Sequence, residues 1–313
     1  MLGGSLVIVV AASGFGILGP LARFGYDAGL DPLSFVAWRA TFALIVIGVV
    51  VAVLDRRGRP VIALWRLPPR DRWGILAVGL AGFALNVSMF VAFGLTSIAI
   101  ALLAFYTYPS LVAVTAAALG HERLDSGRIA ALVLALAGMV LVVGGSLGSS
   151  GAVSVHPLGV LLGLGAAVGQ TAFVTISRSR FETLPPEQAM GWIIAITAVG
   201  CTIVALLAGS PFGIVFRRTD ALGLAVLGGV VGAGIPSVLF LIGIRAIGAV
   251  RAGILMLIEP LVGVSLAALL LHEGVAPVQV LGGAAILVAA VLVQRGTTRE
   301  TIEPAGVPSV EHG

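Results

Sequence analysis

Apolar runs of about 20 residues recur along almost the whole chain, separated by short joints that carry the arginines. An α-helix needs about 20 predominantly apolar residues to cross the roughly 30 Å hydrocarbon core of a bilayer. Only 10% of the 313 residues are charged, whereas about a quarter are charged in a typical soluble domain. The chain therefore cannot cover a water-facing surface of this size, and we predict an all-α membrane protein.

The hydropathy pattern predicts ten transmembrane helices. We expect them at about residues 5–24, 31–53, 73–94, 97–119, 127–145, 157–177, 187–209, 221–243, 249–271 and 277–294. If the N-terminus lies inside, the inner joints and the C-terminal segment hold fourteen of the 18 basic residues, and the outer joints hold only Arg23, Arg217 and Arg218. Cytoplasmic loops carry such an excess. We therefore predict a multi-pass protein of the cell inner (plasma) membrane, with both termini and a polar tail at 295–313 in the cytoplasm.

Two segments of the chain, residues 100–124 and 251–275, align without a gap. They share a proline followed twelve residues later by a His-Glu pair, which is a rare combination in so apolar a chain. The shared residues are Pro109, His121 and Glu122 in the first segment and Pro260, His272 and Glu273 in the second, 151 residues later.

This offset moves the motif from the fourth predicted helix to the ninth, which is an odd number of helices. The two His-Glu pairs are therefore expected on opposite faces of the membrane. We predict two inverted five-helix repeats, at 5–145 and 157–294, an architecture found in many secondary transporters.

All 18 basic residues are arginine, and the absence of lysine excludes two classes of site. A Walker A loop needs a lysine to bind phosphates, and a retinal or pyridoxal Schiff base forms on a lysine. The single cysteine, Cys201, allows neither an intramolecular disulfide nor a cysteine cluster for metal or redox chemistry. We therefore expect no cofactor and no metal site.

Two short motifs match enzyme signatures without the context that those signatures need. GFGILG at 14–19 fits G-x-G-x-x-G, but it lies inside an apolar run instead of between a strand and a helix. Ser146 and Ser150 lie in a Gly/Ser-rich joint without the strand–turn–helix arrangement of a nucleophile elbow. We expect that the protein is not an enzyme. It is also not expected to bind nucleic acid, because its arginines lie where membrane orientation requires them.

Several motifs, taken in their order along the chain, resemble the drug/metabolite transporter superfamily of EamA type. They are WRATFA from Trp38, LIEP ending at Pro260, and the His-Glu endings of the fourth and ninth predicted helices. The resemblance covers nearly the whole chain as two EamA-like units. It implies that helices 1–4 and 6–9 surround a central substrate cavity, with helices 5 and 10 as outer supports. It also implies export or uptake of small metabolites, amino acids or drugs.

Glu259 and Arg39 are expected inside predicted helices, about ten and eight residues from a helix end. Both side chains then lie roughly 12–15 Å deep at a rise of 1.5 Å per residue. A charge at this depth costs on the order of 2.5–3.5 kcal/mol and is usually functional or paired. We expect Glu259 to carry protons or bind a substrate amine, and we hypothesise that Arg39 shares its cavity, either paired with it or bridged to it by substrate. The alternatives are a Glu259 that only locks helices together and an Arg39 that extends outward to the headgroups.

Other polar or aromatic residues within the predicted helices are candidates for lining a substrate cavity. They are Trp38, Asn86, Tyr106, Tyr108, Gln170, Trp192 and Ser237. The alternative for each of them is an ordinary hydrogen bond between helices, and for Trp192 and the two tyrosines also an interfacial or packing role. Glu122 and Glu273 are candidates for gating, or for simple contacts at helix ends.

These features together favour a secondary transporter, expected to export small organic metabolites, amino acids or drugs by alternating access. Its predicted partners are the lipid bilayer, a small-molecule substrate and, as a candidate coupling ion, the proton. A passive channel for small solutes is the main alternative, followed by an intramembrane enzyme and a membrane scaffold.

Overall fold

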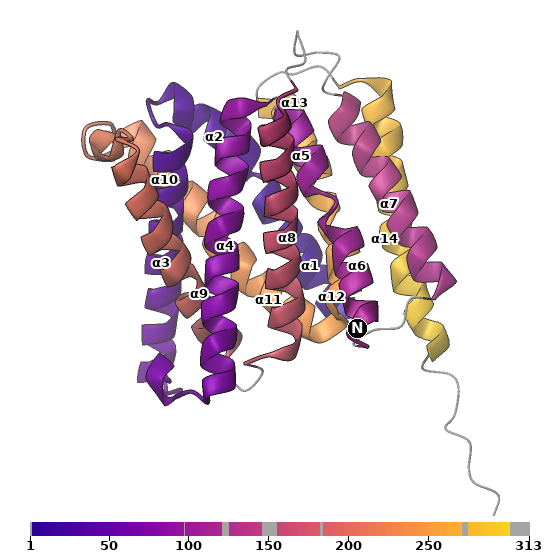
Figure 1. The fold of residues 1–313 in the computed structure, drawn as a ribbon, viewed down its shortest axis with the longest axis horizontal. Coiled ribbons are helices and arrows are strands. Elements are labelled where there is room, and N and C mark those ends of the chain that lie inside the picture. The colour runs from indigo at the N-terminus through magenta and orange to yellow at the C-terminus, as the bar shows by residue number, and fades with distance from the viewer. Residues whose placement is uncertain are drawn as a thin grey trace, which may run out of the picture.

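The computed structural model describes residues 2–96, 98–120, 125–145, 155–181, 184–270 and 275–300. Within these ranges every regular element is helical, and Figure 1 shows the long helices standing side by side as a bundle. Nine helical stretches of the described residues are long and apolar enough to cross a membrane, whereas a further apolar helix, Pro277–Val293, is shorter. The all-α membrane prediction is confirmed, and the tenth span stays a prediction.

The elements follow the expected order. The first half of the chain forms α1 (Leu2–Gly16), α2 (Leu18–Asp27), α3 (Pro32–Arg56), η1 (Leu64–Arg66), α4 (Pro69–Leu95), α5 (Ile98–Phe105), α6 (Tyr108–Ala118) and α7 (Ser126–Gly145). The second half forms α8 (Pro157–Ser179), α9 (Pro186–Leu207), η3 (Phe212–Phe216), α10 (Thr219–Gly229), η4 (Val230–Gly234), α11 (Ile235–Ile247), α12 (Ala249–Met256), α13 (Ile258–Leu270) and α14 (Pro277–Glu300). The helix α14 thus includes residues 295–300, which were predicted to belong to the polar tail, and residues 301–313 lie outside the described ranges.

Four of the spans are interrupted, although the sequence predicted single helices. Two of them break at α5/α6 and α12/α13, directly before Pro109 and Pro260. A proline lacks the backbone N–H and clashes with the carbonyl four residues earlier, so it interrupts a helix from within. The span of α10 and α11 contains the π-helical turn η4 just before Pro236. The fourth interruption lies at Ile17, between α1 and α2.

The breaks at Pro109 and Pro260 occupy the same place in the sequence repeat. Figure 1 shows α5 above α6, but α12 below α13, so these two broken spans run in opposite directions. They also touch, because α6 packs against α12 and a Cβ placed on Gly253 would lie 3.7 Å from Pro109. The two interruptions therefore face each other inside the bundle.

Contacts between the two halves occur in matching pairs. The helix α1 packs on α11, and α8 packs on α4. A Cβ on Gly14 would lie 2.4 Å from Pro236, and one on Gly169 would lie 3.3 Å from Leu85. Leu85 and Pro236 are separated by the same 151 residues that relate the two prolines at the breaks. Each half thus presents the same contact position to the other.

The pair α7 and α14 lies at one edge of the bundle (Figure 1) and packs mainly on itself. Gly138 and Gly282 bring the two backbones together, because a Cβ on either glycine would lie within 2.6 Å of the other glycine's carbonyl oxygen. Small residues allow this close approach in membrane helices, where van der Waals contact replaces the hydrophobic effect. The arrangement agrees with the outer-support role that the family resemblance implies for the fifth and tenth helices.

Gly138→Ala is expected to destabilise this helix pair, because the added methyl group meets a backbone oxygen that cannot move aside. A loss of about 1–3 kcal/mol is the usual effect of overpacking, and thermal unfolding of the purified protein in detergent measures it. Gly144→Ala is the matched control in α7, since a Cβ there meets nothing within 4 Å. Equal stability of the two variants would contradict the close contact.

Candidate functional site

Arg39 is held inside the bundle by the helix that follows it in the chain. It lies in α3, about two turns after an N-terminus that is fixed by Pro32 and by a capping box between Asp31 and Ser34. Its Nη2 donates a hydrogen bond of 2.6 Å to Asn86 Oδ1 on α4. The guanidinium also lies over the ring of Phe90, 6.0 Å from its centre. Arg39 is therefore directed toward α4 and not outward to the headgroups.

Asn86 is positioned by its own helix and is not free to rotate. Its Nδ2 donates a hydrogen bond of 2.7 Å to the carbonyl of Gly82, one turn earlier in α4. This bond leaves the Asn86 carbonyl oxygen directed at Arg39. Among the described residues the buried Nε of Arg39 has no hydrogen-bond partner, so the guanidinium keeps the capacity to donate to a further acceptor.

Glu259 lies where a broken span restarts. It occupies the first turn of α13, and the partial positive charge at a helix N-terminus favours a carboxylate there. The side chains of Glu259 and Tyr106 lie close enough to interact electrostatically. Tyr106 lies at the break between α5 and α6 and is only 2% exposed. The acid at one break thus meets a phenol at the other.

Arg39 and Glu259 interact electrostatically but do not form a direct ion pair. Within the described residues, the guanidinium donates its hydrogen bond to Asn86, while the Glu259 carboxyl lies within electrostatic range of both Arg39 and Tyr106. The structure is therefore compatible with one form of the hypothesis, in which Arg39 and Glu259 share a region without pairing and a substrate bridges them. Tyr108, whose buried hydroxyl has no hydrogen-bond partner in the part of the chain that the structure describes, also interacts electrostatically with Glu259. We call Arg39, Asn86, Phe90, Tyr106, Tyr108 and Glu259 the central cluster.

Trp38 contacts a different part of the molecule from its neighbour Arg39. Its Nε1 donates a hydrogen bond of 2.9 Å to the carbonyl of Phe212, and its ring stacks on Phe212 and Phe42 with centroid separations of 4.5 and 5.7 Å. Phe216 packs edge-on against the same ring. Trp38 thus anchors the short helix η3.

The remaining predicted residues have no hydrogen bond or ring contact with the central cluster among the described residues, or lie outside the described ranges. Trp192 packs against the main apolar core. Gln170 and Ser237 are partly exposed, and Ser237 stands 151 residues after Asn86, at the equivalent repeat position. Glu122 and Glu273 fall outside the described ranges. A binding or gating role for each of these residues stays a prediction.

A second polar arrangement, which the sequence did not indicate, closes the end of the bundle that carries most of the arginines. Arg245, at the end of α11, donates hydrogen bonds of 2.8 and 2.9 Å to the carbonyls of Leu184 and Phe181. The backbone N–H of Phe181 donates to Asp71 on α4 at 3.2 Å. Phe181 is also the one described non-glycine residue with a positive φ, of 44°. We call these four residues the Arg245 clamp.

In the sequence, Arg245 could not be distinguished from arginines that only set the orientation of a membrane protein, because arginines are expected at cytoplasmic helix ends. Phe90 was missed as well, since a lone phenylalanine in an apolar helix gives no pattern. A positive φ at a non-glycine residue is a conformational strain that the surrounding contacts must maintain. The clamp therefore holds a strained loop between α4 and α11.

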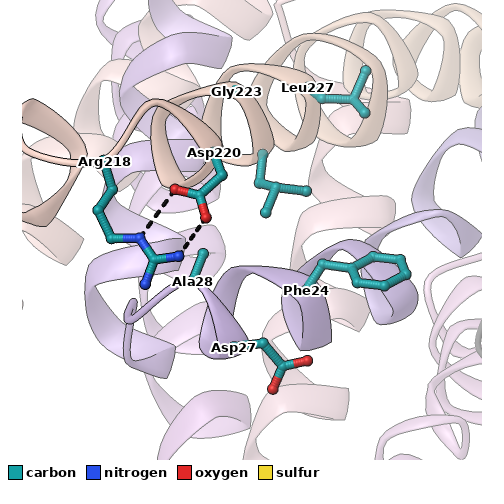
Figure 2. Close-up of a pocket in the computed structure, with 8 residues that line it drawn as sticks. Phe24, Asp27, Ala28, Arg218, Asp220, Gly223 and Leu227 are labelled. Carbon is teal, nitrogen blue, oxygen red and sulfur yellow. Dashed lines mark hydrogen bonds and ion pairs between the residues drawn. The ribbon is translucent and has the colours of Figure 1, made fainter.

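A pocket of about 590 Å³ opens at the opposite end of the bundle, between α2 and α10. Its lining residues are Phe24, Asp27, Ala28, Arg218, Asp220, Gly223, Leu224 and Leu227. Figure 2 shows Arg218 bound to Asp220 beside the pocket, through hydrogen bonds of 3.1 and 2.5 Å. None of the lining residues belongs to the central cluster.

Arg245→Gln is expected to loosen the arginine-rich end, because glutamine cannot reach both carbonyls with charged donors. Ser177, which is fully buried in α8, serves as the reporter position. In a Cys201→Ala, Ser177→Cys background, Arg245→Gln should raise the rate of maleimide labelling several-fold. Arg59→Gln is the control at the same end, and an equal labelling rate in both variants would contradict a closing role for the Arg245 clamp.

Comparison with known proteins gives a consistent result. The sequence matches the EamA-like transporter family over residues 2–144 and 157–295. An uncharacterized transporter of Archaeoglobus fulgidus is 28% identical over 93% of this chain and 96% of its own length. An aromatic amino acid exporter, YddG, of Ancylobacter novellus is 30% identical over 51% of this chain and 56% of its own length. A solved crystal structure shares the fold, with a TM-score of 0.79 and 23% identity, over 97% of this chain and 99% of that one.

Proposed function

This chain belongs to the EamA-like transporter family, and we propose that it is a secondary transporter that exports amino acids by alternating access. The observation that supports an amino acid substrate is that the positive and the negative side chain of the central cluster are separated. An amino acid presents a carboxylate and an ammonium group, which require a cation and an anion placed apart. Arg39 and Glu259 supply these, and neither is neutralised by a direct ion pair within the described structure.

Each charge has the geometry for its partner. Arg39 is held at one guanidinium nitrogen by Asn86, so its remaining N–H groups are available to a carboxylate, which arginine binds through parallel hydrogen bonds. Glu259 lies near the phenol of Tyr106, and its carboxyl can bind an ammonium group. The relative named as an aromatic amino acid exporter supports the same substrate class.

Aromatic rings surround the two charges and favour a large apolar or aromatic substrate side chain. Phe105 contacts Tyr106 and Tyr108 with ring centroids 5.2 and 5.3 Å apart, and Phe90 lies beside Arg39. Aromatic pairs contribute about 0.5–1.5 kcal/mol beyond the area they bury. A phenylalanine or tryptophan side chain placed among these rings would gain such contacts.

The alternating-access part of the proposal rests on the repeat. Two broken spans run in opposite directions and meet at equivalent positions, as expected of halves inserted with opposite topology. The Arg245 clamp joins α4, α11 and the segment between α8 and α9 at one end only. Access to the central cluster from that end requires the hydrogen bonds of the Arg245 clamp to break. The two halves would then move relative to each other at that end.

We infer that Glu259 couples export to protons by competition. A proton and a substrate ammonium group cannot occupy the same carboxylate together, so each must leave before the other binds. An amino acid moving outward would then exchange for a proton moving inward. A passive channel has no such exclusion and would show neither saturation nor counterflow.

Arg39→Gln is expected to raise the KM for phenylalanine by at least tenfold in proteoliposomes, because the charged hydrogen bonds to the substrate carboxylate are lost. Arg39→Lys should recover part of the loss. Arg217→Gln, an exposed arginine outside the central cluster, should leave the KM unchanged. Arg39→Gln with an unaltered KM would exclude this residue from substrate binding.

Glu259→Gln is expected to abolish the response of transport to an imposed pH gradient while substrate counterflow continues at reduced affinity. The reason is that glutamine still accepts a hydrogen bond from the ammonium group but cannot take up a proton. Measuring both fluxes in the same vesicles separates coupling from binding. Wild-type transport that ignores the gradient, or a gradient response that survives in Glu259→Gln, would rule out coupling at this residue.

A further inference from the structure

The pocket between α2 and α10 has a charged rim and an apolar floor. We propose that it binds the headgroup of a phospholipid with a primary ammonium group, that is, a phosphatidylethanolamine, in the leaflet at this end of the bundle. We call it the α2–α10 pocket, with the lining residues given above. The proposal concerns the lipid that surrounds the protein and is independent of the substrate bound at the central cluster.

The charges on the rim favour an ammonium group. Two carboxylates, Asp27 and Asp220, and one guanidinium, that of Arg218, line the pocket, and Figure 2 shows the Asp27 carboxyl directed away from the Arg218–Asp220 pair. Asp220 is already bound to Arg218, whereas Asp27 is exposed and its carboxyl has no hydrogen bond or ion pair among the described residues. The excess negative charge therefore lies at Asp27. An ammonium group with three donors can satisfy it, while the Arg218 N–H groups that do not contact Asp220 can bind the adjoining phosphate.

The depth of these residues corresponds to a lipid headgroup. Asp27 is the last residue of the candidate span Gly3–Asp27, and Asp220 is the second residue of the span Thr219–Ile247. Phe24, Leu224 and Leu227 lie one to two helical turns further into their spans. The carboxylates thus stand where the hydrocarbon core begins, and the apolar floor lies within it. A phospholipid headgroup, followed by its glycerol and upper acyl carbons, likewise changes from polar to apolar toward the hydrocarbon core.

An apolar surface continues from the floor of the pocket along the same span. Leu227, Val231 and Ile235 follow one another at four-residue spacing and are 44%, 36% and 49% exposed. All three side chains are exposed along one span, through the π-helical turn η4, so they extend the apolar surface below the charged rim. An acyl chain would cover this surface, whereas a small soluble amine would leave it bare. This continuity is the reason to assign the pocket to a lipid.

Native mass spectrometry of the full-length protein in detergent tests the proposal directly. The probes are phosphatidylethanolamine, its N-methylated and N,N-dimethylated forms, and phosphatidylcholine, all with the same acyl chains. Methylation preserves the charge but removes donors one at a time, so binding should weaken stepwise, with phosphatidylcholine about tenfold weaker overall. Asp27→Asn should reduce phosphatidylethanolamine binding by a similar factor.

Two control variants and one soluble probe complete the experiment. Arg217→Gln and Glu187→Gln alter charges outside the α2–α10 pocket and should leave lipid binding unchanged. Equal binding of all four lipids, or unaltered binding in Asp27→Asn, would overturn the proposal. Glycerophosphoethanolamine, which has the headgroup without acyl chains, should fail to compete. If it displaced the lipid at equal concentration, the pocket would be a site for soluble amines instead.

Discussion

The structure depends on the requirement that backbone polar groups be satisfied within the membrane. An unbroken helix meets this requirement by itself, and a proline within a span violates it unless neighbouring groups compensate. Pro109 and Pro260 create such interruptions at equivalent positions of the two halves, and the interruptions face each other. Tyr106 and Glu259 lie at these breaks and interact electrostatically. The polar centre of the bundle is thus a consequence of where the helices fail to continue.

The two charges of the central cluster are kept apart by neutral partners, and this separation gives the site its chemistry. A direct ion pair between Arg39 and Glu259 would satisfy both residues and leave nothing for a ligand to neutralise. Asn86 instead holds Arg39 at one side, and Glu259 lies near Tyr106, so that each charge can still bind a ligand. The two ends of the bundle also differ from each other. The Arg245 clamp joins the two halves at one end, and the hydrogen bonds of Ser210 to Asp31 and of Trp38 to Phe212 join them at the other end, where the α2–α10 pocket opens.

Much of the fold could be predicted from the sequence. Apolar runs of sufficient length form helices in a bilayer, and Pro109 and Pro260 recur at the same place in each half. The sequence also indicated Arg39 and Glu259, since charged residues are rare at that depth. The sequence could not show that Trp38 contacts η3 whereas Arg39 contacts α4. The direction in which each side chain points depends on how α3 is rotated about its axis. The Arg245 clamp was equally invisible, since its acceptors are backbone carbonyls that any residue type provides.

The central claim is that the two halves are inserted with opposite orientation around one polar site. Gly58, between α3 and α4, and Gly213, in η3 between α9 and α10, occupy equivalent connections and are both exposed. Cysteine introduced singly at each position, in a Cys201→Ala background, can be labelled with a membrane-impermeant maleimide in intact cells and in inverted vesicles. The account predicts labelling of Gly213→Cys only from outside and of Gly58→Cys only from inside. Labelling of both positions from the same side would contradict it.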